Sequence, residues 1–338
     1  MITVFDDAQR AHDPQFFLSS GAAQPCPEKP ARIDALLGAV RRMALPVVQA
    51  PSLDMGAVRA VHPDRYLTFL ENIHTRWQRI AGASAEVIPN IHPDSREAGY
   101  PKSAVGQAGF HMTDTSCPIS AQTWGAALAS AGSALHATDL VLGGARSAYA
   151  LCRPPGHHAF AELAGGFCYL NNSAIAAQHL RAAGRRVAIL DVDLHHGNGT
   201  QGLFYARSDV LTLSIHADPE RFYPFFWGYA GETGSGEGAG ANMNLPLPRG
   251  TGDAGFLTAL DLALDRIAAF GADTLVLALG LDAFEGDPFA GLAVTTPGFA
   301  RIGAAIAALS LPTVIVQEGG YLCPELGDNL EAVLTAFC

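Results

Sequence analysis

Charged side chains are scarce in this chain, and positive charge is the scarcer kind. Asp, Glu, Lys and Arg make up 16% of the 338 residues, and 21 basic against 32 acidic residues leave a net charge of −11. Proteins that bind DNA or RNA normally present a basic face to the phosphates, so we expect no nucleic-acid partner. Hydrophobic residues make up 49% of the chain, which is ample material for the core of a compact enzyme.

Long hydrophobic runs and paired cysteines are also lacking. No uninterrupted apolar stretch reaches the ~18 residues of a membrane-spanning helix, and the first residues do not resemble a signal peptide. None of the six cysteines belongs to a Cys-x-x-Cys pair, and their spacing does not indicate a disulfide framework. We therefore expect a cytoplasmic protein with reduced thiols and no membrane partner.

Short apolar runs alternate along the chain with longer amphipathic ones. The pattern predicts strands at 2–5, 148–152, 187–194, 210–216, 274–281 and 313–317. It predicts helices at 31–42, 64–79, 121–136, 172–183, 255–270, 299–309 and 325–337. Continuous apolar strands separated by helices are typical of a parallel sheet with both faces covered. Because no repeat or linker interrupts the pattern, we expect an α/β fold in a single domain, residues 1–338.

Two segments lack any sustained period. Residues from about 83 to 118 are rich in proline and glycine, and an irregular stretch of that length inside a compact domain usually serves function or assembly. The glycine-rich stretch 228–240 matches neither a dinucleotide fingerprint nor a P-loop. We interpret the second segment as a loop.

The most informative motif is Asp-Val-Asp-Leu-His-His-Gly-Asn-Gly at 191–199, which follows the apolar run 187–190. In a strand that continues to residue 194, side chains alternate between faces, so Asp191, Asp193 and His195 would share one face. Burying unpaired carboxylates costs several kcal/mol each. A bound cation would offset that cost.

Polar residues also follow three other predicted strands. They are the His157-His158 pair after Arg-Pro-Pro-Gly, Asp282, and the Glu-Gly-Gly-Tyr run that ends at Tyr321. Ligands of open α/β sheets bind at this carboxyl edge. A catalytic zinc ion takes nitrogen and oxygen ligands, typically three from the protein, and Asp193, His195 and Asp282 can supply one imidazole and two carboxylates.

The remaining polar groups suit acid–base work on an amide. His157 and His158 can aim their rings at water on the metal, and Asp191 and Asn198 are available to fix their tautomers. Histidines with unlike partners should differ in pKa, which suits a division between base and acid. We favour His158 as the main base, with the exchanged roles left open. Tyr321 can hydrogen-bond a developing oxyanion.

The motifs just quoted resemble those of the zinc-dependent histone deacetylase superfamily, class II-like because Asn stands at 198. The likeness runs nearly end to end and is closest to its bacterial acetylpolyamine amidohydrolases. It implies an arginase/deacetylase-type fold with an open eight-stranded parallel sheet. It also implies Zn²⁺ on Asp193, His195 and Asp282, His157 and His158 as tandem base and acid, and Tyr321 as the group that polarises the carbonyl.

The resemblance further implies a structural K⁺ and an aromatic substrate tunnel. The K⁺ would be held by Asp191, the hydroxyl of Ser214 and the backbone carbonyls of Asp193, His195 and Ile215. Phe167, which follows Gly166, would form one tunnel wall. Phe225 would form the other, with Phe226 as the alternative.

In the polyamine enzymes the proline-rich insertion builds a homodimer interface that gates the active site and supplies acidic residues to the substrate. This chain keeps the insertion, but between residues 104 and 119 its only acid is Asp114, with Val105 and Ser116 near positions where glutamates are expected. We therefore expect deacetylation of small cationic amides, acetylpolyamines or acetylated diamines, giving acetate and free amine.

Three alternatives stay open. The substrate could be an acetyl-lysine peptide or another small amide. The pocket could bind acetylated ligands without turnover, although both histidines and the tyrosine are present. A two-metal ureohydrolase would need more carboxylates near the pocket than the sequence offers.

Overall fold

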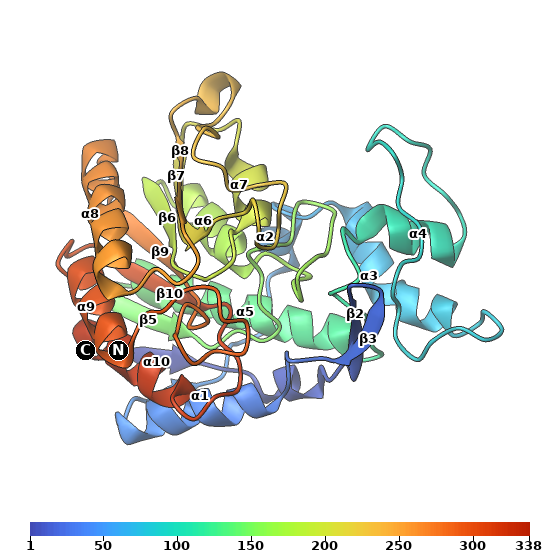
Figure 1. Cartoon of the computed structure of the whole chain (residues 1–338), viewed down its shortest axis with the longest axis horizontal. Helices are drawn as coiled ribbons and strands as arrows, with labels where there is room; N and C mark the ends of the chain where they lie inside the picture. The colour runs from blue at the N-terminus through green and yellow to red at the C-terminus, as the bar shows by residue number, and fades with distance from the viewer.

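The computed structural model describes all 338 residues and has an eight-stranded sheet at its centre (Figure 1). The strand order is β4-β1-β5-β10-β9-β6-β7-β8, and every neighbouring pair is parallel. The strands are β1 (Ile2–Val4), β4 (Val47–Val48), β5 (Ser147–Ala150), β6 (Val187–Asp191), β7 (Val210–Ala217), β8 (Asn242–Leu247), β9 (Thr274–Leu279) and β10 (Thr313–Gln317). The predicted eight-stranded parallel sheet is confirmed.

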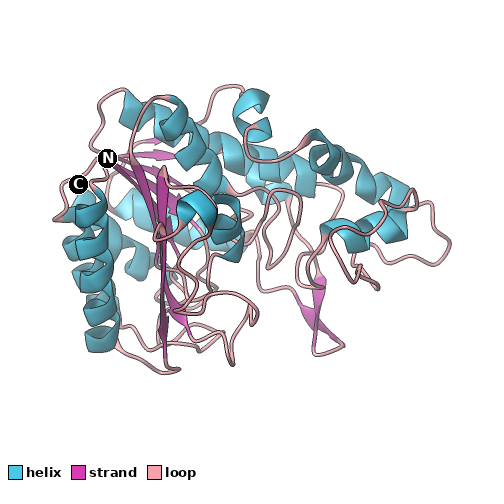
Figure 2. Cartoon of the chain, turned by 90° about the horizontal axis from the view of Figure 1, so that it is seen from above, coloured by secondary structure: helices cyan, strands magenta, loops and turns pink.

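Helices cover both faces of the sheet, as the edge-on view in Figure 2 shows. The helices are α1 (Ala31–Arg42), α2 (Met55–Arg59), α3 (Asp64–Trp77), α4 (Ala104–His111), α5 (Thr123–Leu142), α6 (Asn172–Ala182), α7 (Asn198–Phe204), α8 (Asp253–Phe270), α9 (Thr296–Ala307) and α10 (Leu326–Leu334). None of them is both long enough and apolar enough to cross a membrane.

Side-chain alternation along the strands divides the core into two layers. On β9, Leu275 and Leu277 pack into the cluster under α1, α8, α9 and α10, whereas Val276 packs into the cluster under α5 and α6. The hydrophobic residues of both layers are buried. A strand buried on both faces is apolar at most of its positions, which is why these strands appear in the sequence as nearly continuous hydrophobic runs.

A third core cluster lies beside the sheet rather than on it. It joins α3 and α4 to the start of α5, and Figure 1 shows α3, α4 and the hairpin of β2 (Phe16–Ser19) and β3 (Ala22–Pro25) on the side of the molecule away from α8 and α9. The segment 83–118, predicted to be irregular, contains α4. Ser103 caps this helix by accepting a hydrogen bond from the N–H of Gly106.

The structure corrects one expectation about the central motif. The strand predicted to reach Leu194 ends at Asp191, so Asp193 and His195 lie in the following loop. The cause is local: the carboxylate of Asp191 accepts the N–H of Asp193, and that of Asp193 accepts the N–H of His195. Short Asp side chains that bind the backbone two residues on favour turns over strand pairing.

Candidate active site

Asp193, His195 and Asp282 come together in the loops that follow β6 and β9. Nδ1 of His195 lies 3.3 Å from Oδ1 of Asp193 and 3.1 Å from Oδ2 of Asp282. All three side chains are buried, and their ligand atoms lie within 4.8 Å of one another. The loop rather than strand alternation therefore brings the two residues of the central motif to the same point.

The chemistry of this donor set fits a divalent cation. One imidazole and two carboxylates match the ligands of catalytic zinc, and two carboxylates balance its charge. Burial raises the pKa of Asp282, and the neighbouring Asp193 raises it further. Burial lowers the pKa of His195, but hydrogen bonds to both carboxylates outweigh it and raise that pKa to about 9. Two carboxylates this close need positive charge between them.

Backbone N–H groups fix the two carboxylates. Asp193 accepts the N–H of Gly319 through Oδ2 at 2.7 Å, and Asp282 accepts the N–H of Leu194 through Oδ1 at 3.0 Å. Gly319 lies against both residues: a Cβ there would be 2.4 Å from Oδ2 of Asp282 and 2.5 Å from Oδ2 of Asp193. Only a glycine fits at this position without moving the carboxylates.

His157 and His158 stand side by side next to this cluster, with ring centroids 4.0 Å apart. Nδ1 of His157 lies 2.9 Å from Oδ2 of Asp191, and Nδ1 of His158 lies 2.7 Å from Oδ1 of Asn198. These are the partners that the sequence suggested. One histidine is therefore paired with a charged group and the other with a neutral amide.

The unlike partners drive the two pKa values apart. Burial lowers the pKa of His157, but the carboxylates of Asp191 and Asp193 outweigh it and raise the pKa to about 10. Burial lowers the pKa of His158, and the charged rings of His157 and His195 depress it further. Within this pair, His157 is thus held protonated and His158 neutral, and their division into acid and base stays a prediction.

Tyr321 is buried at the same site and is held by residues that the sequence reasoning missed. Its N–H donates to Oδ2 of Asp287 at 2.9 Å, and its ring packs edge-on against Phe289 with centroids 4.6 Å apart. The guanidinium of Arg32 lies over the ring, 5.0 Å from its centroid. The turn Gly-Asp-Pro-Phe at 286–289, close after Asp282, was the available signal for the first two residues.

A cavity of about 940 Å³ opens onto these groups. Gly166, Phe167 and Phe225 line it, as expected from the resemblance. Phe167 is buried deep in the wall, whereas Phe225 is 47% exposed at the mouth. Next to His195 the wall is formed by Phe222 and Phe289, with ring centroids 5.3 and 5.2 Å from the imidazole.

The expected K⁺ position lies behind the cluster, where β6 and β7 pair Asp191 with Ser214. A small cavity of about 10 Å³ is lined by both residues. Ile215, the next residue on β7, is fully buried. Ligation by these residues stays a prediction.

The fold and this constellation define a metal-site α/β enzyme of the deacetylase type, and the comparisons agree. The family model of the histone deacetylase domain matches residues 26–337, and the chain belongs to this family. Acetylpolyamine amidohydrolase of Burkholderia pseudomallei is 47% identical over 338 residues, covering 100% of this chain and 98% of that protein. Acetylpolyamine amidohydrolase 1 of Pseudomonas aeruginosa is 44% identical, with 100% and 99% covered.

Solved structures give the same result. The crystal structure of acetylpolyamine aminohydrolase from Burkholderia pseudomallei superposes with a TM-score of 0.96 over 100% of this chain and 98% of that one, at 47% identity. The HD domain of HDA15 superposes with a TM-score of 0.80 at 28% identity, covering 100% of this chain and 90% of that one. The expected family and fold are both confirmed.

Proposed function

We propose that this protein is a metal-dependent amidohydrolase that removes acetyl groups from small cationic amides, acetylpolyamines or acetylated diamines. The observation that carries the proposal is that Asp193 and His195 line one cavity together with the histidine pair and Tyr321, while Asp282 lies against Asp193 and His195. Full-length relatives named acetylpolyamine amidohydrolase, 42–47% identical, support the substrate class.

Asp193, His195 and Asp282 would hold the metal, for which Zn²⁺ is our choice. A Zn²⁺ ion at this position would act as a Lewis acid toward the amide oxygen and the attacking water. His158, kept neutral by burial, takes a proton from the water molecule while the water oxygen bonds to the carbonyl carbon. It returns that proton to the nitrogen as the C–N bond breaks, which yields acetate and the free amine.

His157 and Tyr321 stabilise the negative charge that develops during attack. His157 stays protonated because Asp191 faces its Nδ1. The hydroxyl of Tyr321 donates a hydrogen bond to the carbonyl oxygen as this oxygen becomes an oxyanion. A single well-placed donor of this kind contributes about 10²–10³-fold to turnover.

The charges of the cavity wall favour a short substrate. Asp114 is the one carboxylate in the lining besides Asp193, and it already accepts the Tyr223 hydroxyl at 2.6 Å and the N–H groups of Ser116 and Gly166 at 2.7 and 3.1 Å. Within one subunit it has little capacity left for a distant ammonium. We therefore propose acetylated diamines as better substrates than longer acetylpolyamines.

Two further features belong to the proposal. The segment 83–118 forms a homodimer interface and gates the active site, and a structural K⁺ is bound by Asp191, Ser214 and Ile215. Light scattering of the purified protein tests the first: a monomer at micromolar concentration contradicts it. Thermal stability in K⁺ against the larger tetramethylammonium tests the second, since a bound ion stabilises the folded state.

Acetate release from a panel of N-acetylputrescine, N-acetylcadaverine, acetylspermidine and acetyl-lysine peptides tests the function, with metal content measured on the same sample. We expect release from the two diamines, its loss on chelation and its recovery with Zn²⁺. Release from peptides alone would replace the proposed substrate with acetyl-lysine. Tight binding without release would indicate a binding protein. Unchanged turnover in His158→Ala would overturn the assignment of the base.

A further inference from the structure

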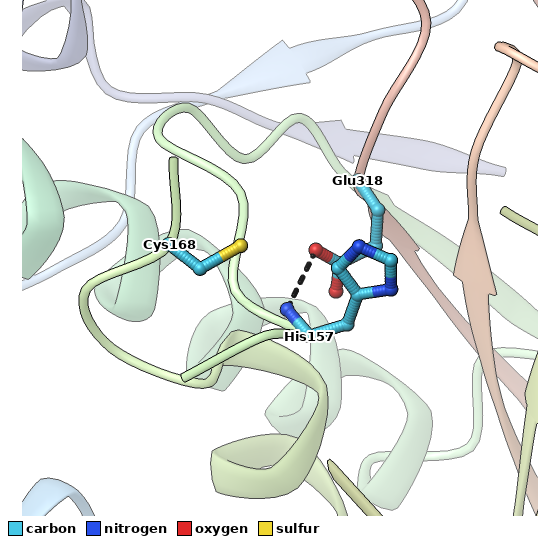
Figure 3. A group of neighbouring side chains, drawn as sticks. All are labelled: His157, Cys168 and Glu318. Carbon is cyan, nitrogen blue, oxygen red and sulfur yellow. Dashed lines mark hydrogen bonds between the residues drawn. The ribbon is translucent and has the colours of Figure 1, made fainter. Parts of the chain in front are cut away.

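Glu318 is a buried carboxylate beside the histidine pair with no assigned role. It follows β10 directly, is fully buried, and uses both oxygens. Oε2 accepts the backbone N–H of Gly156 at 2.6 Å and that of His157 at 3.0 Å, while Oε1 accepts the Ser173 hydroxyl at 2.8 Å. Figure 3 shows that the main-chain nitrogen of His157 makes the hydrogen bond to this carboxylate.

Glu318, His157 and Cys168 lie close enough together to resemble a second metal site. Their hydrogen bonds argue against that interpretation. Both oxygens of Glu318 already accept hydrogen bonds. The thiol of Cys168 donates a hydrogen bond to the carbonyl oxygen of Gly166 at 3.4 Å. Burial raises the pKa of this thiol well above its usual value, so it is not a ready thiolate ligand. We therefore interpret the cluster as a hydrogen-bonded group that holds the backbone of the histidine turn, not as a metal site.

No cationic side chain forms an ion pair with the Glu318 carboxylate. The guanidinium of Arg32 donates instead to the backbone carbonyl of Glu318 at 2.7 Å. Burial accordingly raises the pKa of Glu318 to about 7, although the charge on His157 opposes the rise. Burying a carboxylate without a cationic partner costs several kcal/mol of folding free energy. A residue kept at that cost is expected to serve the function of the site.

The chain around Glu318 contacts both halves of the active site. The Glu318 side chain holds the Gly156–His157 backbone, and the next residue, Gly319, donates its N–H to Asp193 at 2.7 Å. Two residues further on is Tyr321. Movement of the histidine turn relative to the Asp193 cluster must therefore break a hydrogen bond at Glu318 or at Gly319.

We propose that Glu318 is a positioning residue that fixes the His157–His158 turn relative to Asp193 and Tyr321 and thereby sets turnover. The proposal rests on the proposed function for its kinetic consequence, but its structural consequence is independent of the substrate. Misplacing a catalytic group by about 1 Å costs on the order of 10²-fold in rate. The effect falls on kcat, because the side chain does not line the substrate cavity.

Two substitutions separate the hydrogen bonds from the charge. In Glu318→Gln the amide oxygen can take the place of Oε2 and accept both N–H groups, while the NH₂ donates to Ser173. Glu318→Ala removes every one of these bonds. We expect Glu318→Ala to lower kcat about 10- to 100-fold with KM changed less than about threefold, and Glu318→Gln to keep kcat within about fivefold of the wild type.

Hydrogen–deuterium exchange of the peptide that contains Gly156 and His157 provides a readout without substrate. Exchange should accelerate in Glu318→Ala and stay slow in Glu318→Gln. If the alanine variant does not fold, Glu318→Asp takes its place, since a carboxylate one methylene shorter cannot reach both N–H groups. We expect fast exchange and low kcat in this variant too.

Three results would overturn the proposal: wild-type kcat in a folded alanine or aspartate variant, equal loss in the glutamine and alanine variants, or unchanged exchange in all of them. Equal loss would mean that the charge, not the hydrogen bonding, matters. A wild-type protein that releases no acetate from any amine would refute the proposed function instead, and the exchange data would still decide the role of Glu318.

Discussion

A single added methyl group at Gly319 should dismantle the metal site. A Cβ at this position would lie 2.4 Å from Oδ2 of Asp282 and 2.5 Å from Oδ2 of Asp193, where ordinary van der Waals contact begins at 3.4 Å. The backbone of Gly319 has no positive φ that would itself oppose alanine. The whole effect of Gly319→Ala therefore falls on the two carboxylates.

The size of the required movement gives the size of the effect. Both oxygens must retreat by about 1 Å, whereas metal–ligand distances vary by only about 0.2 Å around their preferred values. The carboxylates cannot retreat freely, because Asp193 is held by the N–H of Gly319 itself and Asp282 by that of Leu194. We expect metal affinity to fall at least about 100-fold, with a similar loss of kcat, as for a ligand misplaced by about 1 Å.

The assay is metal content after dialysis at a fixed free Zn²⁺ concentration, with acetate release measured on the same sample. Gly38→Ala is the matched control, since a Cβ at Gly38 inside α1 would meet nothing within 4 Å. It should bind metal normally and gain up to about 1 kcal/mol in stability. Full metal content and activity in Gly319→Ala would refute the assignment of Asp193 and Asp282 as ligands.

Three further predictions address the tyrosine, a buried ion cluster and acid stability. Tyr321→Phe should lower kcat about 10²–10³-fold with little change in KM; a kcat within about twofold of the wild type would remove Tyr321 from the mechanism. Arg153→Met breaks a buried pair with Glu28 at 2.9 Å and should cost about 3–5 kcal/mol, seen as a lower Tm, whereas Arg59→Met at an exposed pair should cost less than about 1 kcal/mol. Similar Tm losses in both variants would contradict this. Burial lowers the pKa of His62 from 6.5 to about 4, so below pH 6.5 the unfolded chain binds a proton that the folded chain refuses. Stability should fall between pH 6.5 and 4 by at most about 3 kcal/mol from this residue, and an equally steep fall in His62→Gln would disprove its part.

Much of the central sheet could be predicted from the sequence because its inner strands are apolar at most positions. The edges could not be predicted in this way. Asn242 and Asn244 of β8 are buried polar residues that hydrogen-bond Gln201, so that strand lacks the hydrophobic signal. β4 has only two residues. Helix α4 lies in a segment rich in proline and glycine and has no clear helical period in the sequence. It is stabilised by tertiary packing against α3.

The sequence also identified the reactive groups of the candidate site better than the residues that hold these groups in place. Motifs at strand ends pointed to Asp193, His195, Asp282 and the histidine pair, because polar side chains stand out after apolar strands. Asp287 and Arg32 do not follow an apolar strand directly, and the turn that contains Asp287 does not by itself reveal its partner. Their roles depend on contacts between distant parts of the chain, such as Arg32 with Gly320 at 2.5 Å, and single-sequence patterns carry no information about those distances.

The place of β10 in the sheet has a consequence for synthesis of the protein. This strand is the last of the sheet to leave the ribosome, yet it pairs with β5 on one side and β9 on the other. Until residues 313–317 emerge, the nascent chain can form only two separate half-sheets, each with an open parallel edge that can template wrong pairings. The strand that joins the two half-sheets is followed at once by Glu318, and Tyr321 comes three residues later. Closure of the sheet and completion of the active site are thus one late event, and a chain that stops before β10 lacks both.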